Sequence, residues 1–281
     1  MTRRKLPLVV LSDVHLGTYG CHATELLLYL KSIQPDMLVL NGDIIDGWAF
    51  SKRYFPASHF AVIKEVFKLI TLGTKVIYLT GNHDEFLRKY SELAMGNLVL
   101  ADKFVINIDG KKMWIFHGDV FDNTTQGSAK ILAKLGGKGY DMLILINRAI
   151  NYLLKITGRE KVSFSKKVKN SVKKAVAFIN NFEDTIADLA IEKGYDYVVC
   201  GHIHQPTKKE IETENGKVMY LNSGDWVENL TALEYENNAW KIFYYDDNDF
   251  ILERAVLPKY AGNKRIDFEE QVSLMHTFSH S

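Results

Sequence analysis

The chain has 281 residues, of which 47% are hydrophobic, as expected for a packed globule that needs no stapling by disulfides. Its 35 lysines and arginines nearly balance its 34 aspartates and glutamates, so the net charge of +1 excludes a global field that draws the protein to nucleic acid or membranes. The two cysteines, Cys21 and Cys200, form no disulfide framework and favour a reducing compartment.

The N-terminus places the basic residues 3–5 ahead of an apolar run at 6–11. Asp13 and His15 interrupt this run too early for a signal peptide. No later stretch approaches the roughly 18 to 20 uninterrupted apolar residues of a membrane-spanning helix. We therefore expect a cytoplasmic protein, and peripheral contact with the inner face of the cell membrane stays open.

The first part of the chain alternates strands and helices. Apolar runs predict strands at 6–11, 37–40 and 76–79, and helical spacing of apolar residues predicts helices at 22–32 and 60–70. Pro35 should break the chain before the second strand, and Gly73 should end the second helix. This order implies parallel strands joined by right-handed crossovers.

The later strands come in pairs around turn residues. Predicted hairpins are centred on Asp109-Gly110, Asn215-Gly216 and Asn237-Asn238, and another apolar run predicts a strand at 197–200. We expect this later half to be antiparallel and the molecule to hold two facing sheets with helices outside. Between residues 126 and 194 we predict no strand but two helices, at 142–156 and 165–193.

Five apolar runs end in aspartate, asparagine or histidine. Taken singly, such residues are most often turn formers or helix caps. Five together at the carboxyl ends of strands indicate a site, because ligands of α/β sheets bind there. A buried carboxylate such as Asp43 costs several kcal/mol unless it is paired with protons or metal ions. The converging residues are Asp13, His15, Asp43, Asn82, His83, Asp84, His117, Asp119, His202 and His204.

These side chains predict a metal site. Aspartate, histidine and asparagine without cysteine favour Mn²⁺, Fe²⁺ or Zn²⁺. In the triplets 13–15 and 202–204, alternation along an extended backbone turns both outer side chains to the same side. With Asp43 as a bridging carboxylate, the remaining groups suffice for two ions that share a water.

The motifs Asp13-x-His15, Gly42-Asp43, Gly81-Asn82-His83-Asp84, His117-Gly118-Asp119 and Gly201-His202-x-His204 resemble, in this order, those of the calcineurin-like metallophosphoesterases. The resemblance spans roughly residues 6–245. It implies an α/β fold, a four-layer α/β/β/α sandwich, with two metal ions. Asp13, His15, Asp43 and His204 would hold the first, and Asp43, Asn82, His117 and His202 the second.

The resemblance also implies the chemistry. Two divalent ions would acidify a shared water and neutralise phosphoryl oxygens, so that water attacks phosphorus in line. His83 is predicted to protonate or hydrogen-bond the leaving oxygen, and Asp84 to orient its ring. Asp46 and Asp119 either hold ligand histidines in the right tautomer or have structural roles.

A narrower resemblance rests on the stretch 223–229, on Thr231-Ala232-Leu233 and on Asp46-x-Trp48. These residues resemble the UDP-2,3-diacylglucosamine diphosphatases of lipid A biosynthesis, which release UMP and lipid X. That family implies a helical lid, here 126–194 within a metallophosphoesterase domain of residues 1–250, followed by a tail at 251–281. It favours Mn²⁺ as cofactor and Asn82, His83, Asn170, Lys173 and His202 as substrate-binding residues. His83 stands where the best-defined branch carries arginine.

The predicted lid is basic at one end. Residues 159–174 contain seven basic residues and one acidic residue, with Lys166, Lys169 and Lys173 at helical spacing. This stripe either contacts the diphosphate or lipid headgroups or is a solvated helix face. The apolar segment 142–156 either lines an acyl pocket or packs on the core.

Two other functions stay open. The same machinery could act on another phosphodiester, a soluble one such as a cyclic nucleotide, or on a phosphoprotein. A non-catalytic binding scaffold is the alternative of another class, although it would tolerate broken ligand motifs and none is broken here. We expect no nucleic-acid partner, and the sequence does not predict the oligomeric state.

Overall fold

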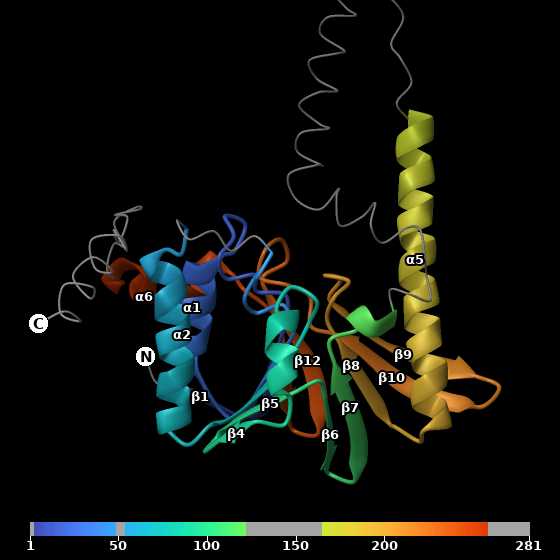
Figure 1. Ribbon diagram of the computed structural model, residues 1–281, viewed down its shortest axis with the longest axis horizontal. Helices are drawn as coiled ribbons and strands as arrows, with labels where there is room; N and C mark the ends of the chain where they lie inside the picture. Colours follow the sequence, from blue (N-terminus) through green and yellow to red (C-terminus); the bar gives the residue numbers. More distant parts are fainter. Residues whose placement is uncertain (1–2, 49–53, 122–164, 258–281) are drawn as a thin grey trace, which may run out of the picture.

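Two β-sheets lie face to face and helices cover their outer faces (Figure 1). The computed structural model describes residues 3–48, 54–121 and 165–257, with the backbone alone over 165–176. Helices α1 and α2 lie on one sheet and α5 lies on the other. This arrangement confirms the predicted four-layer sandwich.

The larger sheet has seven strands in the order β12-β11-β1-β2-β3-β5-β4, and its centre is parallel, from β1 to β5. Its strands are β1 (Arg4–Leu11), β2 (Ile33–Asn41), β3 (Lys75–Leu79), β4 (Ala94–Met95), β5 (Leu98–Ala101), β11 (Thr231–Glu236) and β12 (Ala239–Tyr244). Because β1, β2 and β3 are parallel, their carboxyl ends lie at the same edge of the sheet.

The smaller sheet has five strands in the order β6-β7-β8-β10-β9. They are β6 (Lys103–Ile108), β7 (Lys111–Phe116), β8 (Tyr197–Cys200), β9 (Thr207–Thr213) and β10 (Gly216–Asn222). The predicted hairpins are confirmed, but β8 is parallel to both β7 and β10, so our antiparallel expectation is wrong for this strand. A long connection joins β7 to β8, so the chain can return to the end of the sheet at which β7 began, and β8 can then run parallel to β7.

The helices are α1 (Ala23–Ser32), α2 (Ala57–Thr71), α5 (Ser165–Glu192) and α6 (Ile251–Val256), with 3-10 turns η1 (Glu85–Tyr90) and η3 (Asp247–Phe250). Among the helices described, none is both long and apolar enough to span a membrane. Gly73, with φ of +99°, follows the end of α2 as predicted.

Three features differ from the predictions. Pro35 lies inside β2 and pairs with Leu6, because β3 joins β2 only from Met37 onward and leaves one side of Pro35 without a strand. The short strands β4 and β5 were not predicted, although Leu98-Val99-Leu100 is an apolar run. The turn η1 was not predicted either.

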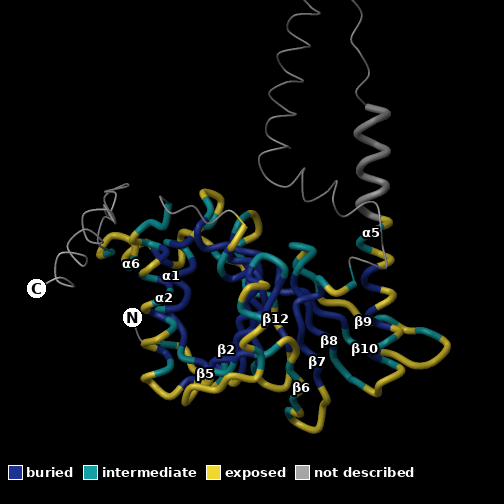
Figure 2. Tube along the Cα trace, viewed as in Figure 1, coloured by how far each residue is buried: buried dark blue, intermediate teal, exposed yellow. Residues whose placement is uncertain are grey.

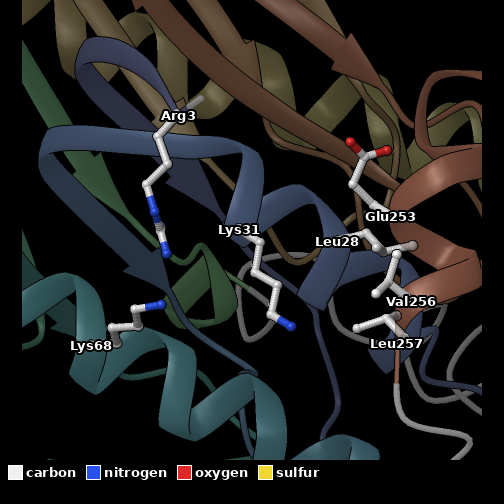
Figure 3. Close-up of a pocket in the computed structure, with 7 residues that line it drawn as sticks. All are labelled: Arg3, Leu28, Lys31, Lys68, Glu253, Val256 and Leu257. Atoms are coloured by element: carbon white, nitrogen blue, oxygen red, sulfur yellow. The ribbon is translucent and has the colours of Figure 1, made fainter. Parts of the chain in front are cut away.

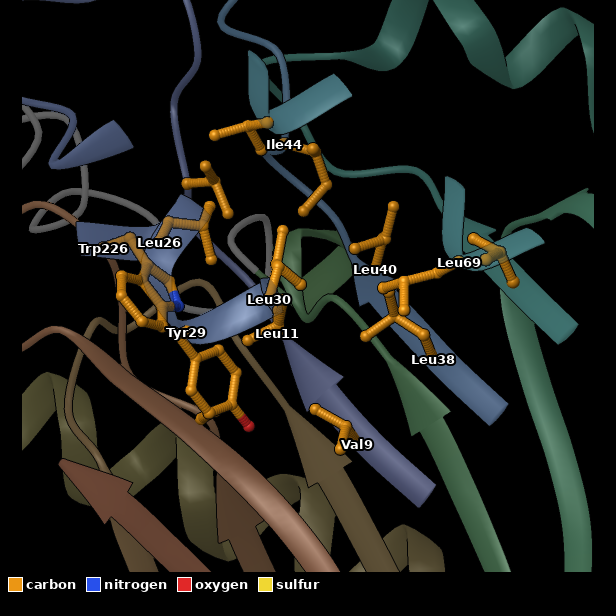
Figure 4. Close-up of a cluster of buried hydrophobic side chains, with 14 of the residues drawn as sticks. Val9, Leu11, Leu26, Tyr29, Leu30, Leu38, Leu40, Ile44, Leu69 and Trp226 are labelled. Atoms are coloured by element: carbon orange, nitrogen blue, oxygen red, sulfur yellow. The ribbon is translucent and has the colours of Figure 1, made fainter. Parts of the chain in front are cut away.

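Three apolar clusters separate the layers. One lies between the larger sheet and helices α1 and α2, and it includes Leu11, Tyr29 and Trp226 (Figure 4). A second fills the space between the sheets, and the third packs α5 against the smaller sheet. Figure 2 shows that burial is greatest along the strands. Each sheet is therefore packed against apolar side chains on both of its faces.

A pocket of about 480 Å³ opens between α1, α2 and α6 (Figure 3). Arg3 at the amino end of β1 lines it, so it lies away from the carboxyl ends of the strands. Arg254 of α6 contacts Glu25 of α1 at 2.8 Å. The domain limits of 1–250 and 251–281 stay a prediction, and of the predicted lid 126–194 the structure describes residues from 165 onward.

Candidate metal centre

The loops that follow β1 and β2 run side by side at the edge of the larger sheet. The amide of Asp13 donates to the carbonyl of Gly42 at 3.1 Å, and the amide of His15 donates to the carbonyl of Asp43 at 2.9 Å. Across the sheet interface, the side chain of Asn41 donates to the carbonyl of Phe116 at 3.1 Å. These backbone links bring polar residues of both sheets to one place.

Two clusters of possible ligand atoms form there. Asp13, His15 and His204 make one, and Asp43, His117 and His202 the other, each with its ligand atoms within 4.8 Å of one another. A third group, His15, Asp43 and His83, meets the same distance limit and shares a residue with each of these two. His204 Nε2 lies 3.1 Å from Asp13 Oδ1, and His117 Nε2 lies 3.2 Å from Asp43 Oδ2. The structure thus brings together the residues predicted for two ions, and their role as ligands stays a prediction.

The unsatisfied polar atoms of the site fit metal ions. Two buried side-chain atoms among the predicted ligands, His15 Nε2 and Asn82 Oδ1, have no hydrogen-bond partner, and two more, Asp13 Oδ1 and His117 Nε2, have only the ion-pair contacts just described. Buried polar atoms in native proteins almost always have a partner. Carboxylate, amide and imidazole lone pairs are suitable ligands for divalent cations, so the residues present fit such ions.

The second nitrogen of two histidines fixes their tautomers. His117 Nδ1 lies 2.9 Å from the carbonyl oxygen of Asn41, which can only accept, so Nδ1 carries the proton. His15 Nδ1 lies 3.2 Å from Asp46 Oδ2 in the same way. Both rings therefore turn Nε2 toward the cluster, and once Nε2 gives up its proton in favour of a bound cation it offers a lone pair there, as metal-binding histidines do.

Backbone strain is concentrated in the same residues. Positive φ angles are unusual for residues other than glycine and persist where the surrounding structure imposes them, often at functional sites. Five predicted ligands have them: Asp13 (51°), His15 (54°), Asp43 (54°), His202 (68°) and His204 (56°). The fold holds these residues in strained conformations that bring their side chains to one point.

Two glycines allow the close approach of the loops. A Cβ atom at Gly42, whose φ is +81°, would lie 2.4 Å from Cγ of His117. A Cβ at Gly81 would lie 2.3 Å from Oδ1 of Asp43. Larger residues at either position would displace a predicted ligand.

The carboxylates of the site stay ionised. Burial alone would raise the pKa of Asp43, but the positive charge of His117 lowers it to about 2. Burial would also raise the pKa of Asp13, but the charges of His204 and other histidines outweigh it and hold that pKa well below its usual range. Burial would lower the pKa of His204, but Asp13 and Asp225 raise it to about 9. Ionised carboxylates are the state that binds cations.

His83 contacts Asp46 rather than Asp84. Its Nδ1 lies 2.9 Å from Asp46 Oδ2, while its Nε2 lies 4.0 Å from Asp43 Oδ2. Burial lowers the pKa of His83, but the hydrogen bond to Asp46 and the charges of Asp43 and Asp46 raise it more. The ring is therefore held by one carboxylate while its other nitrogen faces the cluster.

The prediction that Asp84 orients His83 is wrong. The Asp84 carboxylate turns into the interior and accepts hydrogen bonds from Tyr78 Oη at 2.6 Å, from the amide of Gly81 at 2.6 Å and from the amide of Ile44 at 3.0 Å. It ties together the loops after β2 and β3. Proximity in sequence misled us, because Asp84 begins η1 and its side chain is fully buried.

Other predicted residues have different surroundings. Asp46 contacts the rings of both His15 and His83, which agrees with the first of its two predicted roles, holding a ligand histidine in the right tautomer. Asp119 accepts from Arg88 at 2.9 Å, which is a structural contact. Asn170 and Lys173 lie in α5 where side chains are not described, and the apolar segment 142–156 lies outside the described residues.

The loop 223–229 supports His204, a role that sequence reasoning missed. Asp225 Oδ2 lies 3.8 Å from His204 Nδ1, and the Asn229 side chain donates to the carbonyl of His204 at 2.8 Å. Asp225 also accepts from the backbone amide of Val227 at 2.7 Å, and Ser223 Oγ lies 2.6 Å from Ser12 Oγ. The motif itself was visible in the sequence, but nothing in it indicated which ligand it touches.

The chain is similar to several known proteins. The family model described as Calcineurin-like phosphoesterase matches residues 6–206. A protein of Aliivibrio fischeri named UDP-2,3-diacylglucosamine hydrolase is 22% identical to this chain, and the match covers 84% of this chain and 98% of that protein. A protein of the same name from Pseudomonas syringae pv. syringae is also 22% identical, and the match covers 89% of this chain and 99% of that protein. A solved phosphoesterase from E. coli is 15% identical with a TM-score of 0.41, covering 85% of this chain and 93% of that one.

Proposed function

Because the chain belongs to the calcineurin-like phosphoesterase family, and is a metal-dependent phosphoester hydrolase in consequence, we propose that it cleaves the diphosphate of UDP-2,3-diacylglucosamine. The products are UMP and the 1-phosphate of the acylated sugar. The observation that supports the site is the pair of neighbouring clusters, one of which contains Asp43, with buried ligand atoms that lack hydrogen-bond partners at His15 and Asn82. The substrate is supported by relatives that match nearly end to end.

The two clusters divide the cations between them. Asp13, His15, Asp43 and His204 would hold one ion, and Asp43, Asn82, His117 and His202 the other; we assign Mn²⁺ to both, with Fe²⁺ and Zn²⁺ as alternatives that the same ligands accept. When bound, such ions supply an acidified water and neutralise phosphoryl oxygens.

The protein residues supply the rest of the chemistry. His83, with Nδ1 held by Asp46, donates a proton or hydrogen bond from Nε2 to the oxygen that leaves phosphorus. Asp46 keeps the ring of His15 turned toward the cluster as well. The Asp225 and Asn229 side chains fix the loop that carries His204. Asn82, His83 and His202 also line the place where the phosphoryl group binds.

Helix α5 extends beyond the edge of the smaller sheet (Figure 1). Asn170 and Lys173 lie in the amino-terminal half of this helix. We assign these two residues to the diphosphate or the sugar, and the apolar segment 142–156 to the acyl chains. Peripheral contact with the inner face of the cell membrane follows from an acylated substrate. The +1 net charge implies that any such attraction is local to the basic stripe.

The test is hydrolysis of UDP-2,3-diacylglucosamine in detergent micelles with Mn²⁺, followed by release of UMP. Asp43→Asn removes the central carboxylate while keeping its shape. Asp36→Asn is the matched control, because Asp36 is an exposed aspartate in β2, the strand that precedes the loop of Asp43. We expect the wild type and Asp36→Asn to release UMP and Asp43→Asn to lose at least 100-fold in kcat.

A second candidate function is favoured by His83 in the place of the arginine of the best-defined branch. Such a protein hydrolyses a phosphodiester other than UDP-2,3-diacylglucosamine. Bis(p-nitrophenyl) phosphate in parallel assays separates the two. Turnover of this ester alone, still abolished by Asp43→Asn, would retain the phosphohydrolase and reject the lipid substrate.

A further inference from the structure

Three consecutive residues after β2 surround His83. The Asp46 carboxylate is 2.9 Å from His83 Nδ1, and the amide of Gly47 donates to the carbonyl of His83 at 2.8 Å. The indole of Trp48 lies against the imidazole, with ring centroids 4.2 Å apart and planes inclined by 34°. The segment therefore holds the backbone, one nitrogen and one face of the same histidine.

The segment is itself fixed so that this contact is reproducible. The amide of Trp48 donates to Asp46 Oδ1 at 3.1 Å, which ties the indole to the carboxylate that binds His83. A Cβ atom at Gly47 would lie 2.8 Å from the carbonyl oxygen of His83 and 2.9 Å from the ring of Phe86. Only glycine lets the two loops approach this closely.

The contact is not explained by core packing. Trp48 is 62% exposed, whereas Trp226 and Trp240 are buried. An indole left in water loses most of the free energy that burial gives an aromatic side chain. The indole contacts the ring of His83. That ring also meets the ring of His15 edge to face, with their centroids 4.6 Å apart and their planes at 88°. His83 is thus confined between the cluster and the indole.

We propose that Trp48 is a positioning residue for the reaction: its indole holds the imidazole of His83 in the orientation from which Nε2 meets the leaving oxygen. This inference rests on the proposed function, in which His83 assists departure of that oxygen. Asp46 holds the ring at Nδ1, but one hydrogen bond tolerates a range of angles and so still allows the ring plane to tilt. The indole face removes this freedom, as proton transfer in the transition state requires.

The leaving group makes the idea testable. Assistance by an acid matters more when the leaving oxygen is more basic. Bis(p-nitrophenyl) phosphate loses a stable p-nitrophenolate, whereas diphenyl phosphate loses the more basic phenolate. kcat and KM are measured for both esters with Mn²⁺, for Trp48→Ala, Trp48→Phe, His83→Ala and the double variant. Tyr244→Ala is the control, because Tyr244 is an exposed aromatic residue on β12.

We expect His83→Ala to lower kcat for diphenyl phosphate by about 100-fold or more, and much less for the nitrophenyl ester. Trp48→Ala should lower it about 10-fold for diphenyl phosphate and less than about 3-fold for the nitrophenyl ester, with KM unchanged. Trp48→Phe keeps an aromatic face and should recover most of the loss. In the His83→Ala background, Trp48→Ala should cost nothing further, and Tyr244→Ala should behave as wild type.

Equal losses of Trp48→Ala on both esters, or losses that add to those of His83→Ala, would overturn the inference and leave the hydrolase intact. Loss of bound metal in Trp48→Phe would also overturn it, because the indole would then support the ligands instead. If His83→Ala itself showed no dependence on the leaving group, the role of His83 in the proposed function would fail, and with it that of Trp48. Loss of all turnover in Asp43→Asn stays a separate result.

Discussion

Single residues at the metal centre are limited by space as much as by chemistry. Five of the seven predicted ligands adopt positive φ angles, and the loops that carry them touch through glycines. The sequence predicted the ligand types because aspartate, asparagine and histidine follow apolar runs. It did not predict the partner of His83. Asp84 is adjacent to His83 in sequence, whereas Asp46 comes close only through the fold, which turns the Asp84 carboxylate inward.

Gly42→Ala should abolish activity while Gly73→Ala should not. Both glycines have positive φ, so each change costs about 1–2 kcal/mol of backbone strain. At Gly42 the new methyl group also meets His117, whereas no atom lies within 4 Å of that position at Gly73. Bound Mn²⁺ and phosphodiesterase activity in the two variants provide the measurement. Full metal content in Gly42→Ala would contradict the account.

His59 should make stability depend on pH. Burial lowers its pKa to about 4, and its Nδ1 accepts from the amide of Gly17 at 2.9 Å. The unfolded chain, in which histidine titrates near 6.5, takes up the proton first as pH falls. The stability that neutral His59 allows is therefore complete above pH 6.5 and declines toward pH 4, by up to about 3 kcal/mol.

The measurement is urea unfolding at several pH values for the wild type and for His59→Asn, whose amide oxygen can still accept from Gly17. The wild type should lose more unfolding free energy than the variant between pH 7 and pH 5. Parallel pH dependence of the two proteins would show that His59 does not carry this effect.

At the scale of elements, strong apolar periodicity predicted the parallel strands β1 to β3, the hairpins and α5. The failures have physical causes. Between β3 and β5 the chain has a 3-10 turn and β4 in place of an α-helix, so the strand and helix alternation that marked the earlier strands is lost there. The pairing of β8 depends on where a long connection returns. Pro35 is tolerated in β2 because its neighbour β3 has not yet begun. Tertiary context decided all three.

Helix α5 should stabilise the smaller sheet through its buried face. Ile186 is fully buried against the strands of this sheet, whereas Asp188 on the same helix is exposed. Ile186→Ala should lower the free energy of unfolding by about 2–5 kcal/mol, and Asp188→Ala should change it by less than about 0.5 kcal/mol. Chemical denaturation of both variants measures this, and equal stability of the two would mean that α5 is not packed as described.

The whole molecule places the metal centre across its two sheets. Asp13, Asp43 and Asn82 follow strands of the larger sheet, while His117 and the pair His202 and His204 follow strands of the smaller one. Ions bound by both sets would connect the sheets in addition to the apolar cluster between them. Metal binding should therefore stabilise the entire fold.

Mn²⁺ at 100 times its dissociation constant should raise the unfolding free energy by about 2.7 kcal/mol per ion, which is a rise of several degrees in melting temperature. Removal of metal by a chelator should reverse the rise. Asp36→Asn should respond like the wild type, and Asp43→Asn should respond weakly or not at all. A rise of the same size in Asp43→Asn would place the bound ions elsewhere.

The most direct test of the central claim counts bound metal and measures hydrolysis in the same samples. Wild type, Asp36→Asn and Asp43→Asn are loaded with Mn²⁺, freed of excess metal, and assayed for manganese per chain and for turnover of bis(p-nitrophenyl) phosphate. The account predicts two ions per chain with activity in the first two proteins, and loss of both metal and turnover in Asp43→Asn. Undiminished turnover in metal-free wild type, or two ions retained in Asp43→Asn, would contradict it.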